Sequence, residues 1–107
     1  MRVKIIKDLF MEWERIEFPT FQKGTEVFLS KESNHFNWYE AEISGKETYV
    51  PKHFVTENRL NRDYNPTELA GKIGDIIEVK EIHTRWLLAN DGQGNTGWIL
   101  SENVASV

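Results

Sequence analysis

Residues 92–97 read G-Q-G-N-T-G and match the G-x-G-x-x-G pattern with which dinucleotide-binding folds hold a pyrophosphate. That chemistry needs the glycines to open a helix, because the N–H groups at a helix N-terminus contact the phosphates. Here the segment runs directly into Trp98-Ile99, an apolar pair typical of a strand. The pattern therefore predicts a hairpin loop and not a nucleotide site.

Catalytic and metal-binding groups do not form a recognisable pattern either. The three histidines, His35, His53 and His83, stand alone without a partner at helical spacing, and the chain has no cysteine. A zinc centre needs three or four such ligands brought together. Nothing in the sequence pairs a serine nucleophile with a base. The sequence predicts a non-enzyme without catalytic residues, metal ligands or a cofactor.

Charge and hydropathy restrict the partners. The formal net charge is −4, whereas a nucleic-acid-binding protein needs a basic face to neutralise phosphates. The first residues, M-R-V-K-I-I-K-D, contain no apolar run long enough for a secretion signal or a membrane span. We therefore expect no nucleic-acid or membrane partner and a cytoplasmic location.

The aromatic residues and glycines are organised by an internal repeat. Four landmarks recur in the same order about 50 residues apart: Gly24 and Gly74, Trp38 and Trp86, Tyr49 and Trp98, Val55 and Val104. Each copy reads strand, turn, strand, short corner, strand. The sequence therefore predicts an all-β protein made of two small antiparallel β-barrels in tandem, over residues 1–56 and 57–107.

Alternation of apolar and polar residues, with Gly and Pro at the turns, places the strands. The expected strands cover residues 2–6, 25–30, 36–43, 47–50, 59–63, 76–82, 86–89, 96–100 and 104–107. Residues 7–22 are expected to form a long ordered loop, and only residues 56–58 separate the copies. The expected core consists of Val27, Leu29, Ala41, Ile43 and Val50 in the first copy, and Ile77, Val79, Leu88, Ala89 and Ile99 in the second.

Motifs in both copies resemble the Src-homology-3 (SH3) family. The first copy has F-Q-K-G at 21–24, W-Y-E-A at 38–41 and Y-V-P-K-H-F-V at 49–55. The second has D-Y at 63–64, E-L at 68–69, G-D at 74–75, W-L-L-A at 86–89 and T-G-W-I-L-S-E-N-V at 96–104. The resemblance implies two SH3-like barrels that bind proline-rich segments in the extended polyproline conformation.

The resemblance also implies which residues would form the ligand groove. In the first copy they are the pocket residue Trp38, the corner residues Pro51 and Phe54, Leu9 at a first-strand tyrosine position, and the acidic Glu12, Glu14 and Glu17. In the second copy they are Tyr64 and Trp86, while Arg62, Leu100 and Asn103 replace the family's other groove residues. The alternative interpretation places both tryptophans in the barrel cores and the three acids on a solvated face.

Three functions are compatible with these motifs. The first is a protein-interaction module whose first barrel binds an extended, proline-rich and basic peptide. The second is a structural or assembly protein whose barrels pack on each other or on a folded partner. The third is a cell-wall-binding module of the bacterial SH3 type.

Overall fold

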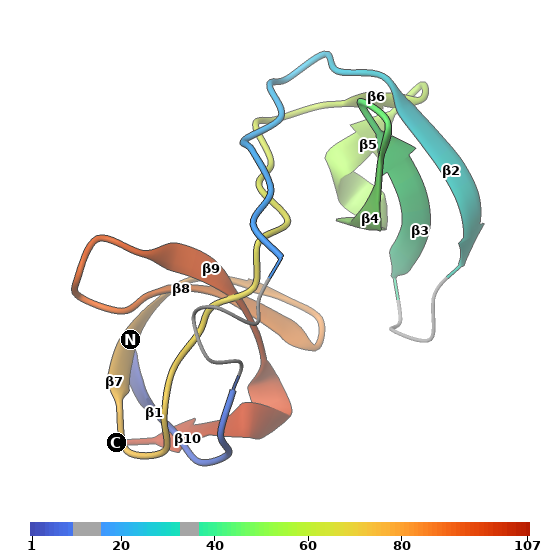
Figure 1. Cartoon of the computed structure of the whole chain (residues 1–107). Coiled ribbons are helices and arrows are strands. Elements are labelled where there is room, and N and C mark those ends of the chain that lie inside the picture. Colours follow the sequence, from blue (N-terminus) through green and yellow to red (C-terminus); the bar gives the residue numbers. More distant parts are fainter. Residues whose placement is uncertain (10–15, 33–36) are drawn as a thin grey trace. The chain divides into compact units, whose positions relative to one another are not determined.

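The structure, a computed structural model, describes residues 1–9, 16–32 and 37–107. Within these residues the chain is all-β, as predicted, with two single turns of 3₁₀ helix (Figure 1). The elements are β1 Arg2–Ile5, β2 Val27–Glu32, β3 Trp38–Ile43, β4 Lys46–Pro51, η1 Lys52–Phe54, β5 Val55–Thr56, β6 Arg59–Leu60, β7 Ile76–His83, β8 Trp86–Asn90, β9 Thr96–Leu100, η2 Ser101–Asn103 and β10 Val104–Ser106. The hydrogen-bonded sheets do not close into barrels.

Strand positions agree with the predicted ones to within about two residues, with two exceptions. β6 is shorter than expected, and the short strand β5 has no counterpart among the expected ranges. The expected long loop between residues 7 and 22 lies partly outside the described residues. In its described part, Phe21 forms an isolated bridge with Tyr64.

The chain divides into two compact units. Unit 1 consists of Met1–Glu17 and Thr67–Val107, and unit 2 is Phe18–Pro66. The expected division between residues 56 and 57 falls inside unit 2. Unit 1 is therefore built from two separate stretches of chain, and unit 2 from one continuous stretch.

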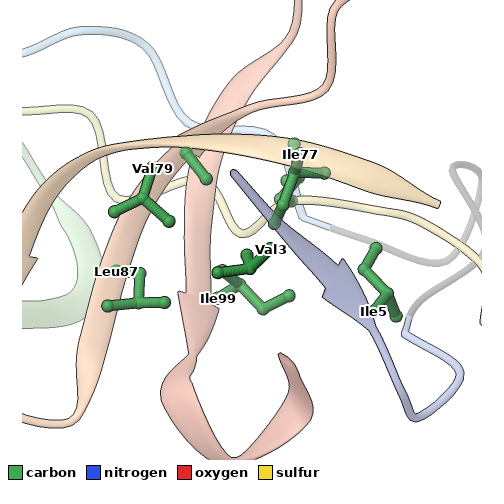
Figure 2. Close-up of a cluster of buried hydrophobic side chains, with 8 residues drawn as sticks. Val3, Ile5, Ile77, Val79, Leu87 and Ile99 are labelled. Atoms are coloured by element: carbon green, nitrogen blue, oxygen red, sulfur yellow. The ribbon is translucent and has the colours of Figure 1, made fainter. Parts of the chain in front are cut away.

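Unit 1 contains a five-stranded antiparallel sheet in the order β10-β1-β7-β8-β9. Its core is formed by the inward-facing apolar side chains of these strands. Figure 2 shows this cluster, with Val3 and Ile5 from β1 among residues of β7, β8 and β9. The cluster consists of Val3, Ile5, Leu69, Ile77, Val79, Leu87, Ala89 and Ile99. Because Ile5 is only 1% exposed, the N-terminal strand is an integral part of this core.

Unit 2 contains a three-stranded antiparallel sheet, β2-β3-β4, and the short hairpin β5-β6. Val27, Ile43 and Val50 are buried between these elements, together with Leu60 of β6. The core of unit 2 therefore includes residues from both predicted copies.

Two core predictions are wrong. Leu29 is 40% exposed, because it lies on an edge strand where the register with β3 shifts between Leu29 and Lys31. Leu88 is half-buried, and Leu87 takes its place in the core. Successive side chains of a strand point to opposite faces, so Leu88 and Ala89 cannot both point inward. The other eight predicted core residues are buried.

The first strand of each repeat completes the unit built mainly from the other repeat. β1 pairs with β7 and β10, whereas β6 pairs with β5. The two strands make corresponding backbone hydrogen bonds. In unit 1, Ile5 N donates to Asp75 O (2.9 Å) and Gly74 N donates to Ile5 O (2.8 Å). In unit 2, Leu60 N donates to Thr25 O (2.9 Å) and Gly24 N donates to Leu60 O (2.8 Å). We call this arrangement the strand exchange.

A two-residue turn explains the strand exchange. Glu57 and Asn58 join β5 to β6 and have φ values of 50° and 62°, the sign required in tight two-residue hairpins. A turn this short leaves residue 59 opposite residue 56, so the first strand of the second repeat must pair with the end of the first repeat. The strand position in unit 2 is then occupied, and β1 takes the corresponding position in unit 1.

Candidate functional site

Four of the predicted groove residues meet in unit 2, but as buried side chains. Trp38, Phe54 and Tyr64 are 5%, 1% and 3% exposed, and Pro51 is fully buried. The Tyr64 ring packs edge-on against Phe54, with centroids 5.4 Å apart, and its hydroxyl donates to the Tyr49 carbonyl oxygen at 2.6 Å. Their faces are therefore covered, which agrees with the alternative interpretation of Trp38 as a core residue.

The remaining predicted groove residues are distributed differently. Leu9 lies in unit 1, because it follows the exchanged strand β1. Trp86 is half-buried at the start of β8, paired with Leu100 of β9. Glu17 is exposed, and Glu12 and Glu14 lie outside the described residues. The described residues predicted for each groove are therefore divided between the two units and do not all lie in one unit.

An open cleft of about 310 Å³ in unit 1 is the candidate functional site. Its lining combines apolar side chains with two carboxylates and one amide: Asp8, Leu9, Glu68, Leu69, Trp98, Ile99, Leu100 and Asn103. Only Leu9 belongs to the groove residues predicted in the first copy. The resemblance places Leu9, Leu100 and Asn103 at groove positions of different copies, and the strand exchange brings these three into one cleft.

The segment that carries Glu68 is held against the edge of β9. Leu69 N donates to Trp98 O at 2.9 Å, and Trp98 N donates to Thr67 O at 3.0 Å, so the segment runs parallel to β9. A Cβ atom on Gly97 would lie 2.8 Å from Leu69 N, closer than real Cβ contacts occur. The absence of a side chain at Gly97 therefore permits the approach that forms one wall of the cleft.

Asp8 and Leu9 form another part of the lining. The Asp8 carboxylate accepts a hydrogen bond from Ile73 N at 3.4 Å, and Leu9 N donates to Gly71 O at 3.3 Å. In unit 2 the Asp63 carboxylate accepts from Lys23 N in the corresponding way, at 2.8 Å. The aspartate after the first strand is thus a shared structural element, and in unit 1 it also lines the cleft.

Burial raises the pKa of Glu68, because removing a carboxylate from water penalises its charged form. The folded-state pKa therefore lies above the unfolded-state value, so the group favours folding most at acidic pH and this contribution is lost as the pH rises through the folded pKa. We expect Glu68→Gln to raise the free energy of unfolding at pH 7 by about 0.5 kcal/mol or less, since the group is partly solvated. Urea denaturation at pH 7 and pH 3 measures this difference, which should vanish at pH 3.

A lower stability of Glu68→Gln at pH 7 would contradict a net desolvation cost at this carboxylate. Glu42→Gln, an exposed change in unit 2 with the same loss of charge, is the control and should leave the unfolding free energy nearly unchanged.

The other motifs form local structure. Residues 92–95 lie in the hairpin loop between β8 and β9, as predicted, where the Asp91 carboxylate accepts from Gln93 N (2.8 Å) and Asn95 N (3.1 Å). His83 contacts Glu81, with Nε2 and Oε1 2.7 Å apart, and its ring lies 5.5 Å from the Trp98 ring. Within the described ranges, no three His, Cys, Asp or Glu side chains gather as a metal site. No helix in this part of the chain has the length and hydropathy to span a bilayer.

Sequence reasoning did not identify Asp8, Glu68 and Trp98 as neighbours. A signal was present: residues 3–9, V-K-I-I-K-D-L, and residues 58–64, N-R-L-N-R-D-Y, match in charge or apolar character at five of seven positions. The two segments occupy corresponding places, residues 3–9 in unit 1 and residues 58–64 in unit 2. No family model, curated protein or solved structure matches this chain, and its function is inferred below from the chemistry of the cleft.

Proposed function

We propose that the chain is a non-catalytic protein-interaction module, made of two SH3-like units, that binds an extended basic peptide in the cleft of unit 1. The single observation that carries the proposal is the lining of the cleft, in which the apolar Leu9 and Leu100 lie beside the carboxylates of Asp8 and Glu68. Apolar ridges accept an extended segment, and carboxylates bind Arg or Lys by charge-assisted hydrogen bonds.

The desolvated Glu68 supports this assignment. Holding a partly buried carboxylate costs stability, and a cationic ligand compensates for the cost when it binds. The proposal places the ligand in unit 1, since the covered Trp38, Pro51 and Phe54 present no ridge in unit 2. Preference for proline in the ligand follows from the resemblance, because a polyproline segment loses little entropy on docking.

Titration with two matched peptides tests the proposal. One is proline-rich with arginines, and the other has glutamates at the arginine positions. We expect the arginine peptide to shift the amide NMR signals of Leu9, Leu100 and Asn103. Glu68→Gln should weaken its binding about three- to tenfold, with a smaller loss at high salt, because the interaction is between charges that salt screens.

Glu26→Gln is the control, because it removes the same charge from an exposed position of unit 2 and should leave the affinity unchanged. Equal binding of both peptides, or signal changes confined to unit 2, would contradict a basic-peptide site in this cleft.

A further inference from the structure

Three of the exposed isoleucines of unit 1 lie where β1 ends and β7 begins. Ile6, Ile73 and Ile76 are 41%, 60% and 45% exposed. Ile76 pairs with Lys4 across the two strands, and Ile6 lies two residues further along, on the same face as Lys4. Ile73 lies in the turn that precedes β7, next to the end of β1, where its N–H contacts the Asp8 carboxylate. We call these three residues the isoleucine patch.

The corresponding surface of unit 2 is polar, although its backbone is bonded in the same way. Ile6 N donates to Asn103 O as Asn61 N donates to Phe54 O, both at 2.8 Å. In unit 2, Lys23 and Glu26 occupy the positions that correspond to Ile73 and Ile76. The backbone N–H of Lys23 donates to the Asp63 carboxylate, and the backbone of Glu26 forms an isolated β-bridge with Arg59. Unit 2 therefore shows that the same backbone hydrogen bonds form with Asn, Lys and Glu at the positions that isoleucine occupies in unit 1. Stability of the fold does not explain the exposed isoleucines, and a grouped apolar surface is typical of a contact site.

Basic groups border the isoleucine patch. Lys4 and Lys72 are exposed, and neither makes an ion pair within the part of the chain that the structure describes. The nearby carboxylates of Asp8 and Asp75 accept hydrogen bonds from the backbone N–H groups of Ile73 and Lys72, at 3.4 and 3.0 Å. The ammonium groups of Lys4 and Lys72 are therefore available to an acidic partner.

Unit 2 carries a surface of complementary character on the outer face of β2, β3 and β4. Phe28 and Tyr49 are 58% and 48% exposed. Across the sheet, Phe28 pairs with Glu42, and Glu42 pairs with Glu47; both glutamates are exposed. Lys31 and Glu40 form an ion pair, with Nζ and Oε2 3.3 Å apart. Because these two charges cancel, Glu42 and Glu47 give the face a net negative charge. We call Phe28, Tyr49, Glu42 and Glu47 the acidic aromatic face.

We propose that the isoleucine patch of one molecule docks on the acidic aromatic face of a second copy of this chain. Aliphatic side chains would cover Phe28 and Tyr49, and the ammonium groups of Lys4 and Lys72 would meet Glu42 and Glu47. The two surfaces differ, so the contact is head-to-tail and joins the patch of one molecule to the face of another. This inference is independent of the peptide-binding cleft, which contains none of these aromatic or isoleucine side chains.

Two charge-neutral variants, each made with residues from the equivalent positions of the other repeat, test the proposal. The patch variant combines Ile73→Lys with Ile76→Glu, and the face variant combines Phe28→Glu with Glu47→Thr. Sedimentation equilibrium over about 10 µM to 1 mM should show self-association of the native chain and at least tenfold weaker association of each variant. An equimolar mixture of the two variants should form a heterodimer, because each retains the surface that the other lacks.

Three results would overturn the proposal: a native chain that stays monomeric to 1 mM, a variant that associates as strongly as the native chain, or a mixture that stays monomeric although both variants are folded. If a variant does not fold, a dilution series of the native chain followed by NMR decides the question. Concentration-dependent shifts must then appear at both Ile73 and Phe28, and shifts at one surface alone, or at neither, contradict the head-to-tail contact.

Discussion

Cutting the chain between residues 56 and 57 is expected to leave two unfolded pieces, whereas residues 18–66 expressed alone should fold. The first piece would lose Leu60 and Tyr64, which are 2% and 3% exposed in unit 2. The second piece would lose Val3 and Ile5 from the core of unit 1. Each such side chain contributes about 1.5–3 kcal/mol by burial, and units of this size have little more than about 5 kcal/mol of net stability.

Amide signal dispersion in NMR spectra distinguishes the folded from the unfolded pieces. Mixing residues 1–56 with residues 57–107 should restore the dispersion, because each piece carries the strand that the other unit needs. Residues 18–66 contain β2 to β6 in one continuous stretch and serve as the matched control. If the two pieces cut at residue 56 fold separately with native stability, each first strand pairs within its own repeat and the strand exchange does not occur.

The strands themselves were predictable because their signals are local. In β9 the residues T-G-W-I-L end at Leu100, and the predicted bounds of 96–100 are confirmed. In β8 the adjacent residues Leu87 and Leu88 are both apolar, so the sequence does not show which of them points inward. The prediction assigned Leu88 to the core, whereas Leu87 is the buried residue. Period and turn residues therefore locate a strand, but they do not decide which face points inward when both faces are apolar.

The partner of each first strand was not predictable from local signals. Residues 3–9 and 58–64 present similar side chains at most positions, so local signals do not reveal which unit each segment joins. What decides the pairing is the turn at Glu57-Asn58, where two non-glycine residues adopt positive φ. Glutamate is uncommon in that conformation, and the sequence alone favoured a connection between two complete copies instead of a hairpin.

The candidate site was also predictable only in part, because local signals do not show which strands pair. The resemblance identified Leu9, Leu100 and Asn103 as groove positions, but it assigned Leu9 to one groove and Leu100 and Asn103 to another. Their combination in one cleft depends on the strand exchange. The burial of Trp38 depends equally on contacts outside its own strand, and its residue type fits a core as well as a binding surface.

Gly97→Ala should be among the most damaging single changes in unit 1. The added Cβ would lie 2.8 Å from Leu69 N and 3.0 Å from the Glu68 carbonyl carbon, and both are backbone atoms that no side-chain rotation can move away. The segment Thr67–Leu69 must then leave the edge of β9, which breaks its two hydrogen bonds to Trp98 and exposes Leu69. We expect a loss of about 2–4 kcal/mol in the free energy of unfolding, since overpacking and lost burial act together.

Gly94→Ala separates steric conflict from backbone strain. Gly94 has a φ of 93°, but a Cβ atom added there would meet nothing within 4 Å, so this variant carries only the conformational cost of about 1 kcal/mol. Urea denaturation compares the two variants, and hydrogen exchange at Leu69 and Trp98 reports whether the segment has detached. Faster exchange at both amides in Gly97→Ala alone is the expected result. Because Glu68 moves with the segment, the same variant should also lose affinity for the arginine peptide, while Gly94→Ala retains it. A Gly97→Ala chain with native stability and native exchange would show that the segment does not approach β9 this closely.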